Sequence, residues 1–412
     1  MRVYRCAGLA NNCGACLELD ERYNCGWCQQ RNRLTNELHE SCEVASQCTS
    51  PGSSWLNRQQ ICPNPRILNF YPRSGPLEGG TNLTIEGINL GRTFEDIEKG
   101  VGIAHELNGK HVNTIPCYPF PEEYVKTTRI KCRIQSPRNV SLSTHQFGSL
   151  VGPVEVRVQT EFTARSRDVY TFVNPKILTI NPSKGPVSGG TLLSIEGLNM
   201  NAGSRAEAFL GSLPCNVTKR TLNHAECITS ARETPGDEQL IIMFDSGQRT
   251  FDYYRFLYVK DPVVTAVESG PTGIWKSIAR GIPNGGILIT VRGENLNIIQ
   301  RPQMYVEVEG ELYVSNCTAT AVTGTEMRCE SPYVSVDQLD FAWTDKDYLE
   351  LEYGFIMDGV AKVRNLSTRT ERPFPKFRMY RNPEFQLFSD PQQIKYYRSE
   401  YLTINVSEKF GA

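Results

Sequence analysis

The fourteen cysteines of this 412-residue chain are unevenly distributed, and their placement constrains the fold more than any other feature. Eight of them lie between Cys6 and Cys62. The other six form three close pairs, which are Cys117/Cys132, Cys215/Cys227 and Cys317/Cys329. Even numbers of closely spaced cysteines indicate disulfides, which persist in oxidising compartments. The sequence therefore predicts an extracellular protein with one cysteine-rich module and three further units.

Charge and hydropathy exclude several classes of protein. The chain has 44 basic and 45 acidic residues and a net charge of -1, which offers no electrostatic basis for binding nucleic acid. It contains no apolar run of about 18 residues, the length that a membrane-spanning helix needs. The first residues also lack the apolar segment of a secretory leader. We therefore expect an internal segment of a longer secreted or membrane-anchored protein, in which Met1 is not the natural start.

Asn-x-Ser/Thr sequons agree with an extracellular location. The candidate N-glycosylation sites are Asn82, Asn139, Asn216, Asn316, Asn365 and Asn405. Asn316 is the least favoured of these because it adjoins Cys317, a predicted disulfide cysteine.

The eight N-terminal cysteines allow more than one chemistry. Cys13-x2-Cys16 and Cys25-x2-Cys28 have the spacing of two zinc half-sites. Four further cysteines in the same segment would have no role in one four-thiolate site, so disulfides are favoured over zinc or a redox pair. Roughly a hundred connectivities remain, and spacing alone does not choose among them. Trp27 and Trp55 are expected to supply most of the small core.

This segment resembles the PSI domain shared by plexins, semaphorins and integrins. The resemblance rests on Cys-Ala-Gly at 6–8, Cys-Gly-Ala-Cys at 13–16 and Tyr-Asn-Cys-Gly-Trp-Cys at 23–28, and the cysteine order matches throughout residues 6–62. It implies four disulfides, Cys6–Cys25, Cys13–Cys62, Cys16–Cys42 and Cys28–Cys48.

A repeat follows the cysteine-rich segment. Gly-Pro-x-x-Gly-Gly-Thr occurs at 75–81 and again at 185–191, and each copy leads into an alternating strand such as Leu83-Thr84-Ile85. A third copy contains Gly285-Gly286 but departs at its start, where an insertion around Trp275 separates Ser269-Gly270-Pro271 from the glycine pair. The glycine pair indicates a turn with positive φ, and the alternation indicates a strand with Leu83 and Ile85 on one face and Thr84 on the other. The pattern predicts antiparallel sandwiches of immunoglobulin type.

The repeat resembles the IPT (TIG) immunoglobulin-like fold found in plexins and in some transcription factors. Each copy holds one cysteine pair at a similar place, which predicts the bridges Cys117–Cys132, Cys215–Cys227 and Cys317–Cys329, with free buried thiols as the alternative. The fold class is therefore mainly β, a small disulfide-rich PSI module followed by tandem IPT/TIG sandwiches. The expected domains are a PSI module at 5–63, IPT repeats at 64–174, 175–261 and 262–381, and the start of a further repeat at 382–412. These last residues are expected to be poorly packed or to lean on the third repeat.

No catalytic, cofactor-binding or metal-binding site is expected. The five histidines lack ligand spacing, and His105 and His111 are six residues apart. No Gly-x-Ser-x-Gly elbow, P-loop or His-Glu-x-x-His motif occurs. The sequence thus predicts a protein that is not an enzyme.

A PSI module followed by IPT repeats resembles plexins, above all the A type, and also hepatocyte-growth-factor-type receptors. The resemblance implies the extracellular stalk of a single-pass type I membrane receptor at the plasma membrane, in axon guidance and cell-migration signalling. Semaphorin would bind a domain outside this fragment, and the stalk would allow co-receptor or homodimer contacts. Short junctions with proline at 62–65, 173–175 and 260–262 predict a stiff spacer that sets ectodomain geometry. The alternatives are an adhesive or ligand-binding ectodomain and, less favoured, a Rel-type DNA-binding role, which would require reduced thiols and basic loops.

Overall fold

The computed structural model describes residues 4–31, 37–107, 110–137, 150–159, 161–270, 278–319, 324–335, 347–360 and 376–382. Asn139, Asn365 and Asn405, the insertion around Trp275 and nearly all of the expected further repeat at 382–412 lie outside the described residues. The chain forms two compact units. The first comprises Met1–Asn181, Ser194–Cys227 and Gln239–Tyr254, and the second comprises Pro182–Leu193, Ile228–Glu238 and Arg255–Ala412. Within the described residues, no helix is long and apolar enough to span a membrane.

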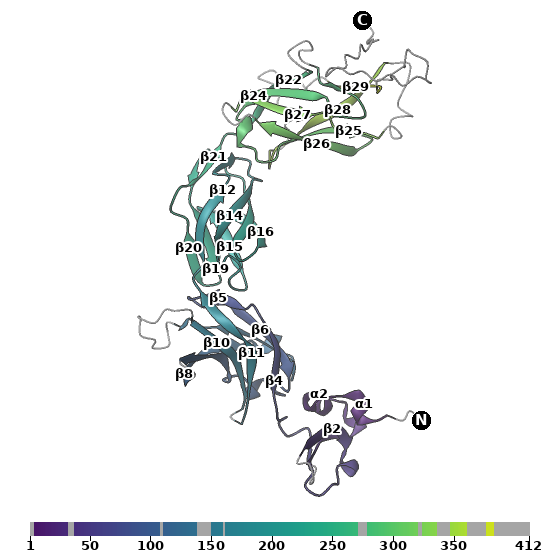
Figure 1. Cartoon of the computed structure of the whole chain (residues 1–412), viewed down its shortest axis with the longest axis vertical. Coiled ribbons are helices and arrows are strands. Elements are labelled where there is room, and N and C mark those ends of the chain that lie inside the picture. The colour runs from purple at the N-terminus through teal and green to yellow at the C-terminus, as the bar shows by residue number, and fades with distance from the viewer. Residues whose placement is uncertain are drawn as a thin grey trace, which may run out of the picture. The chain divides into compact units, whose positions relative to one another are not determined.

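The first unit begins with the cysteine-rich module, in which short helices accompany a three-stranded sheet of order β2-β1-β3 (Figure 1). Its elements are α1 (Cys6–Leu9), α2 (Cys13–Leu17), η1 (Glu21–Tyr23), β1 (Cys25–Arg31), β2 (Leu38–Val44), η2 (Ala45–Gln47) and β3 (Ser54–Leu56). The Asn12 side chain caps α2 by accepting a hydrogen bond from the Ala15 amide at 2.9 Å. Half-cystines supply most of the buried core, together with Trp27. The expectation for Trp55 is wrong, because its ring lies half-buried over Gly26 at the sheet surface.

The same unit continues with an eight-stranded arrangement of order β4-β6-β9-β8-β7-β10-β11-β5. Its elements are β4 (Arg66–Tyr71), β5 (Ser74–Pro76), β6 (Asn82–Ile88), η3 (Phe94–Asp96), β7 (Val101–Leu107), β8 (Lys110–Pro119), η4 (Pro121–Glu123), β9 (Arg129–Ile134), β10 (Leu150–Val158) and β11 (Phe162–Val173). Leu83 and Ile85 are fully buried in its core, as the alternation predicts. Thr84, which the alternation places on the opposite face of β6, is also buried.

The second repeat contributes a seven-stranded sheet that belongs largely to the first unit, with the order β12-β14-β17-β16-β15-β19-β20. Its strands are β12 (Lys176–Asn181), β14 (Leu192–Leu198), β15 (Ala206–Leu210), β16 (Leu213–Arg220), β17 (His224–Thr229), β19 (Leu240–Phe244) and β20 (Gly247–Thr250). A three-stranded sheet of order β13-β21-β18 belongs to the second unit. It consists of β13 (Lys184–Pro186), β18 (Gly236–Glu238) and β21 (Phe256–Val259).

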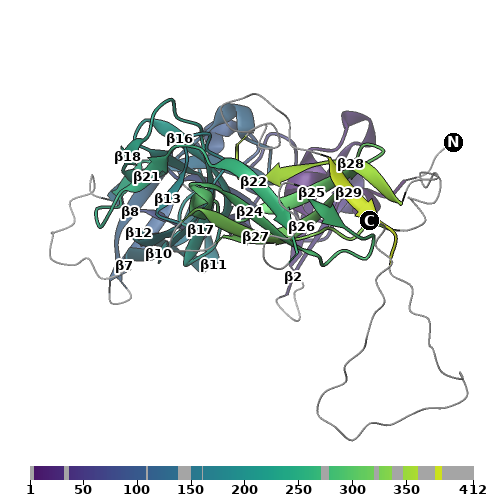
Figure 2. The same cartoon turned by 90° about the horizontal axis from the view of Figure 1, so that it is seen from above.

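The second unit also holds an eight-stranded arrangement of order β22-β24-β27-β26-β25-β28-β29-β23, in which β22, β24 and β27 run side by side (Figure 2). Its elements are β22 (Val263–Ser269), β23 (Arg280–Gly281), β24 (Leu288–Glu294), η6 (Leu296–Ile298), β25 (Gln303–Val308), β26 (Glu311–Ala319), β27 (Glu326–Glu330), β28 (Tyr348–Ile356) and β29 (Phe377–Tyr380). Together these sheets confirm the mainly β fold class, a disulfide-rich N-terminal module followed by sandwich-like sheets.

Purely antiparallel pairing, however, is a wrong expectation. A short strand pairs in parallel with the last strand in each repeat, in the combinations β5/β11, β13/β21 and β23/β29. Glycine is needed in these short strands, because a Cβ on Gly75 would lie 2.2 Å from Thr81 Oγ1, and one on Gly281 would lie 2.6 Å from the Phe377 ring. In the third repeat Gly281, and not Gly270, occupies this position. The insertion therefore precedes the short strand.

Candidate functional site

Two adjacent glycines form the same turn in all three repeats. Their φ angles are 74° and 83° at Gly79–Gly80, 70° and 75° at Gly189–Gly190, and 70° and 77° at Gly285–Gly286. In each turn the first glycine amide donates to the carbonyl oxygen three residues earlier, at 2.9 to 3.0 Å. Left-handed φ values of this kind strain any residue with a Cβ, so the pair predicted from the sequence is required by the backbone.

In the first unit, the turn that joins β19 to β20 docks on the Gly79–Gly80 turn. The Thr81 hydroxyl donates to the Asp245 carboxylate, with 2.6 Å between Oγ1 and Oδ2. The Ser246 amide donates to the Gly79 carbonyl at 3.3 Å. Asp245 itself has a φ of 48°, which aspartate tolerates better than most residues. We call the contact of 79–81 with 245–246 the first latch.

In the second unit, the turn after β28 makes the same contact with the Gly189–Gly190 turn. The Thr191 hydroxyl donates to the Asp358 carboxylate at 2.8 Å, and the Gly359 amide donates to the Gly189 carbonyl at 2.9 Å. Asp358 also has a φ of 48°. We call the contact of 189–191 with 358–359 the second latch. The two latches use the same donors, acceptors and backbone conformation, so the first and second repeats each contact the following repeat through an equivalent turn.

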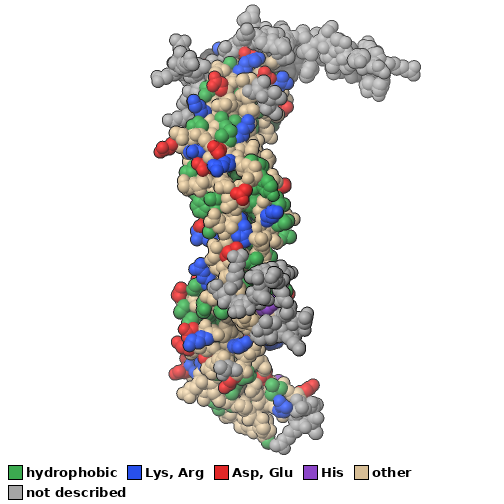
Figure 3. Space-filling view, turned by 90° about the vertical axis from the view of Figure 1, so that its left-hand side faces the viewer, with side chains coloured by type: hydrophobic (Ala, Val, Ile, Leu, Met, Phe, Trp, Pro, Cys, Tyr) green, Lys and Arg blue, Asp and Glu red, His purple; other side chains and the backbone are tan. Residues whose placement is uncertain are grey.

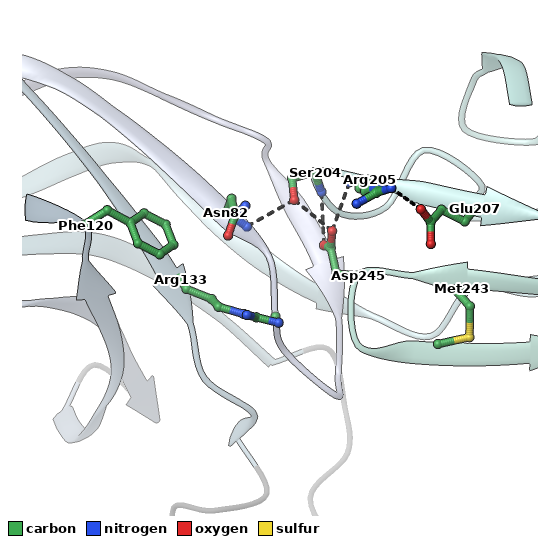
Figure 4. Close-up of a pocket in the computed structure, with 9 residues that line it drawn as sticks. Asn82, Phe120, Arg133, Ser204, Arg205, Glu207, Met243 and Asp245 are labelled. Atoms are coloured by element: carbon green, nitrogen blue, oxygen red, sulfur yellow. Dashed lines mark hydrogen bonds and ion pairs between the residues drawn. The ribbon is translucent and has the colours of Figure 1, made fainter. Parts of the chain in front are cut away.

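The first latch has additional polar support. The Asp245 carboxylate also accepts hydrogen bonds from the Ser204 amide at 3.0 Å, the Ser204 hydroxyl at 2.7 Å and the Arg205 amide at 2.9 Å (Figure 4). Beside it, the Arg249 guanidinium lies 3.1 Å from the Glu78 carboxylate in a largely buried ion pair. Arg249 also donates to the Pro175 carbonyl at 2.9 Å, which ties the pair to the junction segment.

The second latch is less polar. At the position of Glu78 it has Ser188, whose amide donates to the Asp261 carboxylate at 3.0 Å. Burial raises the pKa of Asp358, while the hydrogen bonds from the Thr191 hydroxyl and the Gln300 backbone act in the opposite direction. Both threonines of the two latches are fully buried, so neither hydroxyl can exchange its aspartate partner for water while the latch is closed.

The cysteine-rich module contacts the first repeat through a different set of groups. The Gly14 amide, in the first turn of α2, donates to the Asn89 side chain at 2.8 Å. The Asn89 amide group in turn donates to the Pro63 carbonyl at 3.0 Å. Asn89 is 7% exposed and has a φ of 59°, so one buried asparagine joins the module, the connecting segment and the repeat. A nearby ion pair between Arg92 and Glu18, at 3.3 Å, is also largely buried and lies at the same junction.

The structure brings the cysteines together in seven disulfides. They are Cys6–Cys25, Cys13–Cys62, Cys16–Cys42, Cys28–Cys48, Cys117–Cys132, Cys215–Cys227 and Cys317–Cys329. The sulfur atoms of Cys6, Cys25 and Cys42 lie within 4.8 Å of one another, but all three belong to disulfides and present no thiolate ligand in this form.

Three of the six sequon asparagines fall within the described residues, and their environments differ. Asn216 on β16 is exposed, and so is Asn316 on β26, whose side chain accepts a hydrogen bond from Gln303 at 3.2 Å. Asn82, the first residue of β6, is half-buried beside the first latch. On the face shown in Figure 3, basic and acidic side chains are interspersed along the visible surface.

The threonine–aspartate pairs of the latches were missed by the sequence analysis. A usable signal was present, because Gly-Gly-Thr occurs at both 79–81 and 189–191, and Asp-Ser-Gly at 245–247 parallels Asp-Gly at 358–359. The partners, however, are 164 and 167 residues apart, and no local pattern connects them.

Comparison with known proteins identifies relatives along nearly the whole chain. The IPT/TIG domain family model matches residues 65–163 and 175–258. Plexin-A2 of Mus musculus is 32% identical over 395 residues, which are 94% of this chain and 18% of that protein. Plexin-A4 of Homo sapiens is 30% identical over 397 residues, again 94% of this chain and 18% of that protein. A solved structure of the plexin A4 full extracellular region superposes with a TM-score of 0.71 at 30% identity, over 93% of this chain and 30% of that one. The chain thus spans 18% of the length of these curated relatives.

Proposed function

We propose that this chain, which belongs with the A-type plexins as a homologue of part of their extracellular region, acts as a stiff spacer in a plexin-like receptor. Matches to A-type plexins over 94% of the chain support this assignment. Disulfides and sequons support an extracellular location. The single-pass membrane receptor is proposed from the homology to plexins. Semaphorin would bind a domain outside this segment, and the segment itself would perform no catalysis.

The observation that carries the proposal is the repetition of the latch. A polar contact that occurs once can be incidental, whereas the same threonine–aspartate and amide–carbonyl pair at two successive junctions indicates a shared function. Each latch contains two hydrogen bonds of roughly 1 kcal/mol each, and its threonine is buried. These bonds would favour one relative orientation of neighbouring repeats. Proline in the connecting segments restricts the alternatives further. The spacer would thereby set the distance and angle between bound ligand and membrane.

Domain limits, disulfides and glycans belong to the same proposal. We assign a PSI module to 5–63, IPT repeats to 64–174, 175–261 and 262–381, and the start of a further repeat to 382–412. The seven disulfides would be the native ones, and the six sequons would be the glycosylation candidates. The segment would leave room for co-receptor or homodimer contacts outside the latches.

A flexible insertion between repeats tests the spacer role. Inserting about five Gly/Ser residues between Asn174 and Pro175 of the full-length receptor would uncouple neighbouring repeats, because such linkers behave as flexible coils. We expect strongly reduced signalling with unchanged semaphorin binding, measured on cells by a morphology assay and by surface binding. The same insertion in the exposed turn at Glu309–Gly310, within the third repeat, is the matched control and should signal normally.

Full signalling from the 174/175 insertion would contradict the spacer role. Direct binding of semaphorin to the isolated chain would instead favour the alternative of a ligand-binding ectodomain, because a spacer would leave semaphorin binding to a domain outside this segment.

A further inference from the structure

A hollow of about 270 Å³ lies beside the first latch, between strands of the first and second repeats within the first unit (Figure 4). Residues from β6, β9, β15 and β19 contribute to its walls. The residues that line it are Gly80, Asn82, Phe120, Arg133, Ser204, Arg205, Glu207, Met243 and Asp245. Its volume is slightly below the range of about 300–1,000 Å³ in which drug-sized ligands bind, so it fits a group of monosaccharide size with a few waters.

One lining residue, Asn82, begins the sequon Asn82-Leu83-Thr84. Its backbone amide donates to the Ser204 hydroxyl at 3.1 Å, which holds the start of β6 at the rim of the hollow. Leu83 is fully buried on the opposite side of the strand, so the alternation of β6 directs Asn82 away from the core. Figure 4 shows the Asn82 side chain beside the Phe120 ring and the Arg133 side chain.

The walls of the hollow have the mixed character that suits a sugar. Phe120 and Met243 provide apolar surface for the C–H face of a pyranose ring. Arg133, Arg205 and Glu207 provide charged donors and acceptors for hydroxyl and amide groups. Neither Asn216 nor Asn316 lines this hollow. Among the described sequon asparagines, Asn82 is the one that lines this hollow.

We propose that Asn82 carries an N-linked glycan whose first N-acetylglucosamine lies in this hollow and braces the first latch. Transfer from a lipid-diphosphate-linked oligosaccharide forms the bond between Asn82 Nδ2 and sugar C1, breaks the C1–O bond to the diphosphate, and releases one amide proton. The sugar, covalently part of the first repeat, would then contact Glu207 and Met243 of the second. The inference rests on the extracellular location in the proposed function.

Resistance to enzymatic deglycosylation tests this arrangement. The full chain is secreted from mammalian cells and treated without denaturation with a peptide-N-glycosidase, which must reach the Asn–sugar bond. Glycopeptide mass spectrometry then compares Asn82 with the exposed Asn216. We expect release at Asn82 to be about tenfold slower or more, because the junction must open first, and equally fast after denaturation.

Each outcome decides a different point. An unmodified Asn82 in a chain modified at Asn216, or equal native release at both sites, would overturn the inference. A chain modified at no sequon would instead contradict the proposed extracellular function.

Two further variants distinguish stabilisation of the first latch by the sugar from simple burial of the sugar in the hollow. Phe120→Ala keeps the sequon but removes an apolar wall, so native release at Asn82 should approach the rate at Asn216. Asn82→Gln removes the glycan and should increase hydrogen exchange at the Ser246 amide, whereas trimming the glycan to its first sugar should not. Unchanged exchange in Asn82→Gln would contradict the bracing role.

Discussion

Replacing Gly190 with alanine is expected to open the second latch, whereas the same change at Gly286 should leave its repeat folded and only modestly destabilised. A Cβ on Gly190 would lie 2.2 Å from the Gly359 nitrogen and 2.5 Å from its Cα, and backbone atoms cannot move aside as a side chain can. Gly286 occupies the equivalent turn with a φ of 77° and has no atom within 4 Å of an added Cβ. The pair is therefore matched in backbone strain and differs in the docked partner.

The size of the difference follows from the contacts that are lost. In both variants the free energy of folding becomes less favourable by roughly 1–2 kcal/mol, because alanine must adopt the left-handed backbone conformation. Only Gly190→Ala also loses the two hydrogen bonds of the latch, at roughly 1 kcal/mol each, so its opening free energy should fall by about 2 kcal/mol more. Hydrogen exchange at the Gly359 amide measures that opening directly. Equal protection of this amide in the two variants would show that the latch contributes nothing.

Removing the Cys13–Cys62 disulfide is expected to unfold the cysteine-rich module while the repeats stay folded. This bridge spans 49 residues, nearly the whole module, and the chain-entropy relation gives it about 4 kcal/mol. The module has little else to replace it, because half-cystines make up most of its core. Limited proteolysis of the Cys13→Ala/Cys62→Ala variant should therefore cleave within residues 5–63.

The matched control for this variant is Cys117→Ala/Cys132→Ala. That bridge spans 15 residues and is worth about 3 kcal/mol, but it lies in a repeat with a large aliphatic core. The first repeat should therefore remain protease-resistant. A cysteine-rich module that resists proteolysis without Cys13–Cys62 would contradict this account, provided that non-reducing peptide mapping shows the other six bridges intact.

Local patterns in the sequence predicted the local parts of this fold. The alternation around Leu83 and Ile85 identified a buried strand, and the paired glycines identified a turn that needs positive φ. The parallel strand at Gly75 was not predicted, because its partner strand β11 is distant in sequence and no local pattern shows the pairing of Gly75 with Phe172. The prediction that Trp55 belongs to the core was wrong, because hydrophobicity alone does not distinguish a core residue from one whose ring covers Gly26 at the sheet surface.

The candidate site depended on contacts that no local pattern encodes. Thr81 and Asp245 lie in turn-rich segments where threonine and aspartate are common. Their role arises from a contact between residues that are 164 positions apart in the sequence. The repeat itself, once recognised, carries the information, because Thr191 and Asp358 reproduce the pair at the next junction. At the third glycine pair Ile287 replaces threonine, so a latch of this composition cannot form there.

The most direct test of the spacer role is the distribution of distances across one latch. Fluorophores would be attached through non-natural residues at the exposed Arg167 and Lys219 positions of the first unit, leaving the cysteines untouched. Asp245→Gly removes the carboxylate of the first latch, while glycine accommodates the positive φ at this position. The matched control is Glu309→Gly, because Glu309 has a φ of 50° in an exposed turn of the third repeat. Single-molecule energy transfer should give one narrow distribution for the wild type and for Glu309→Gly, and a broad one for Asp245→Gly. A wild-type distribution as broad as that of Asp245→Gly would contradict the proposal that these repeats form a stiff spacer.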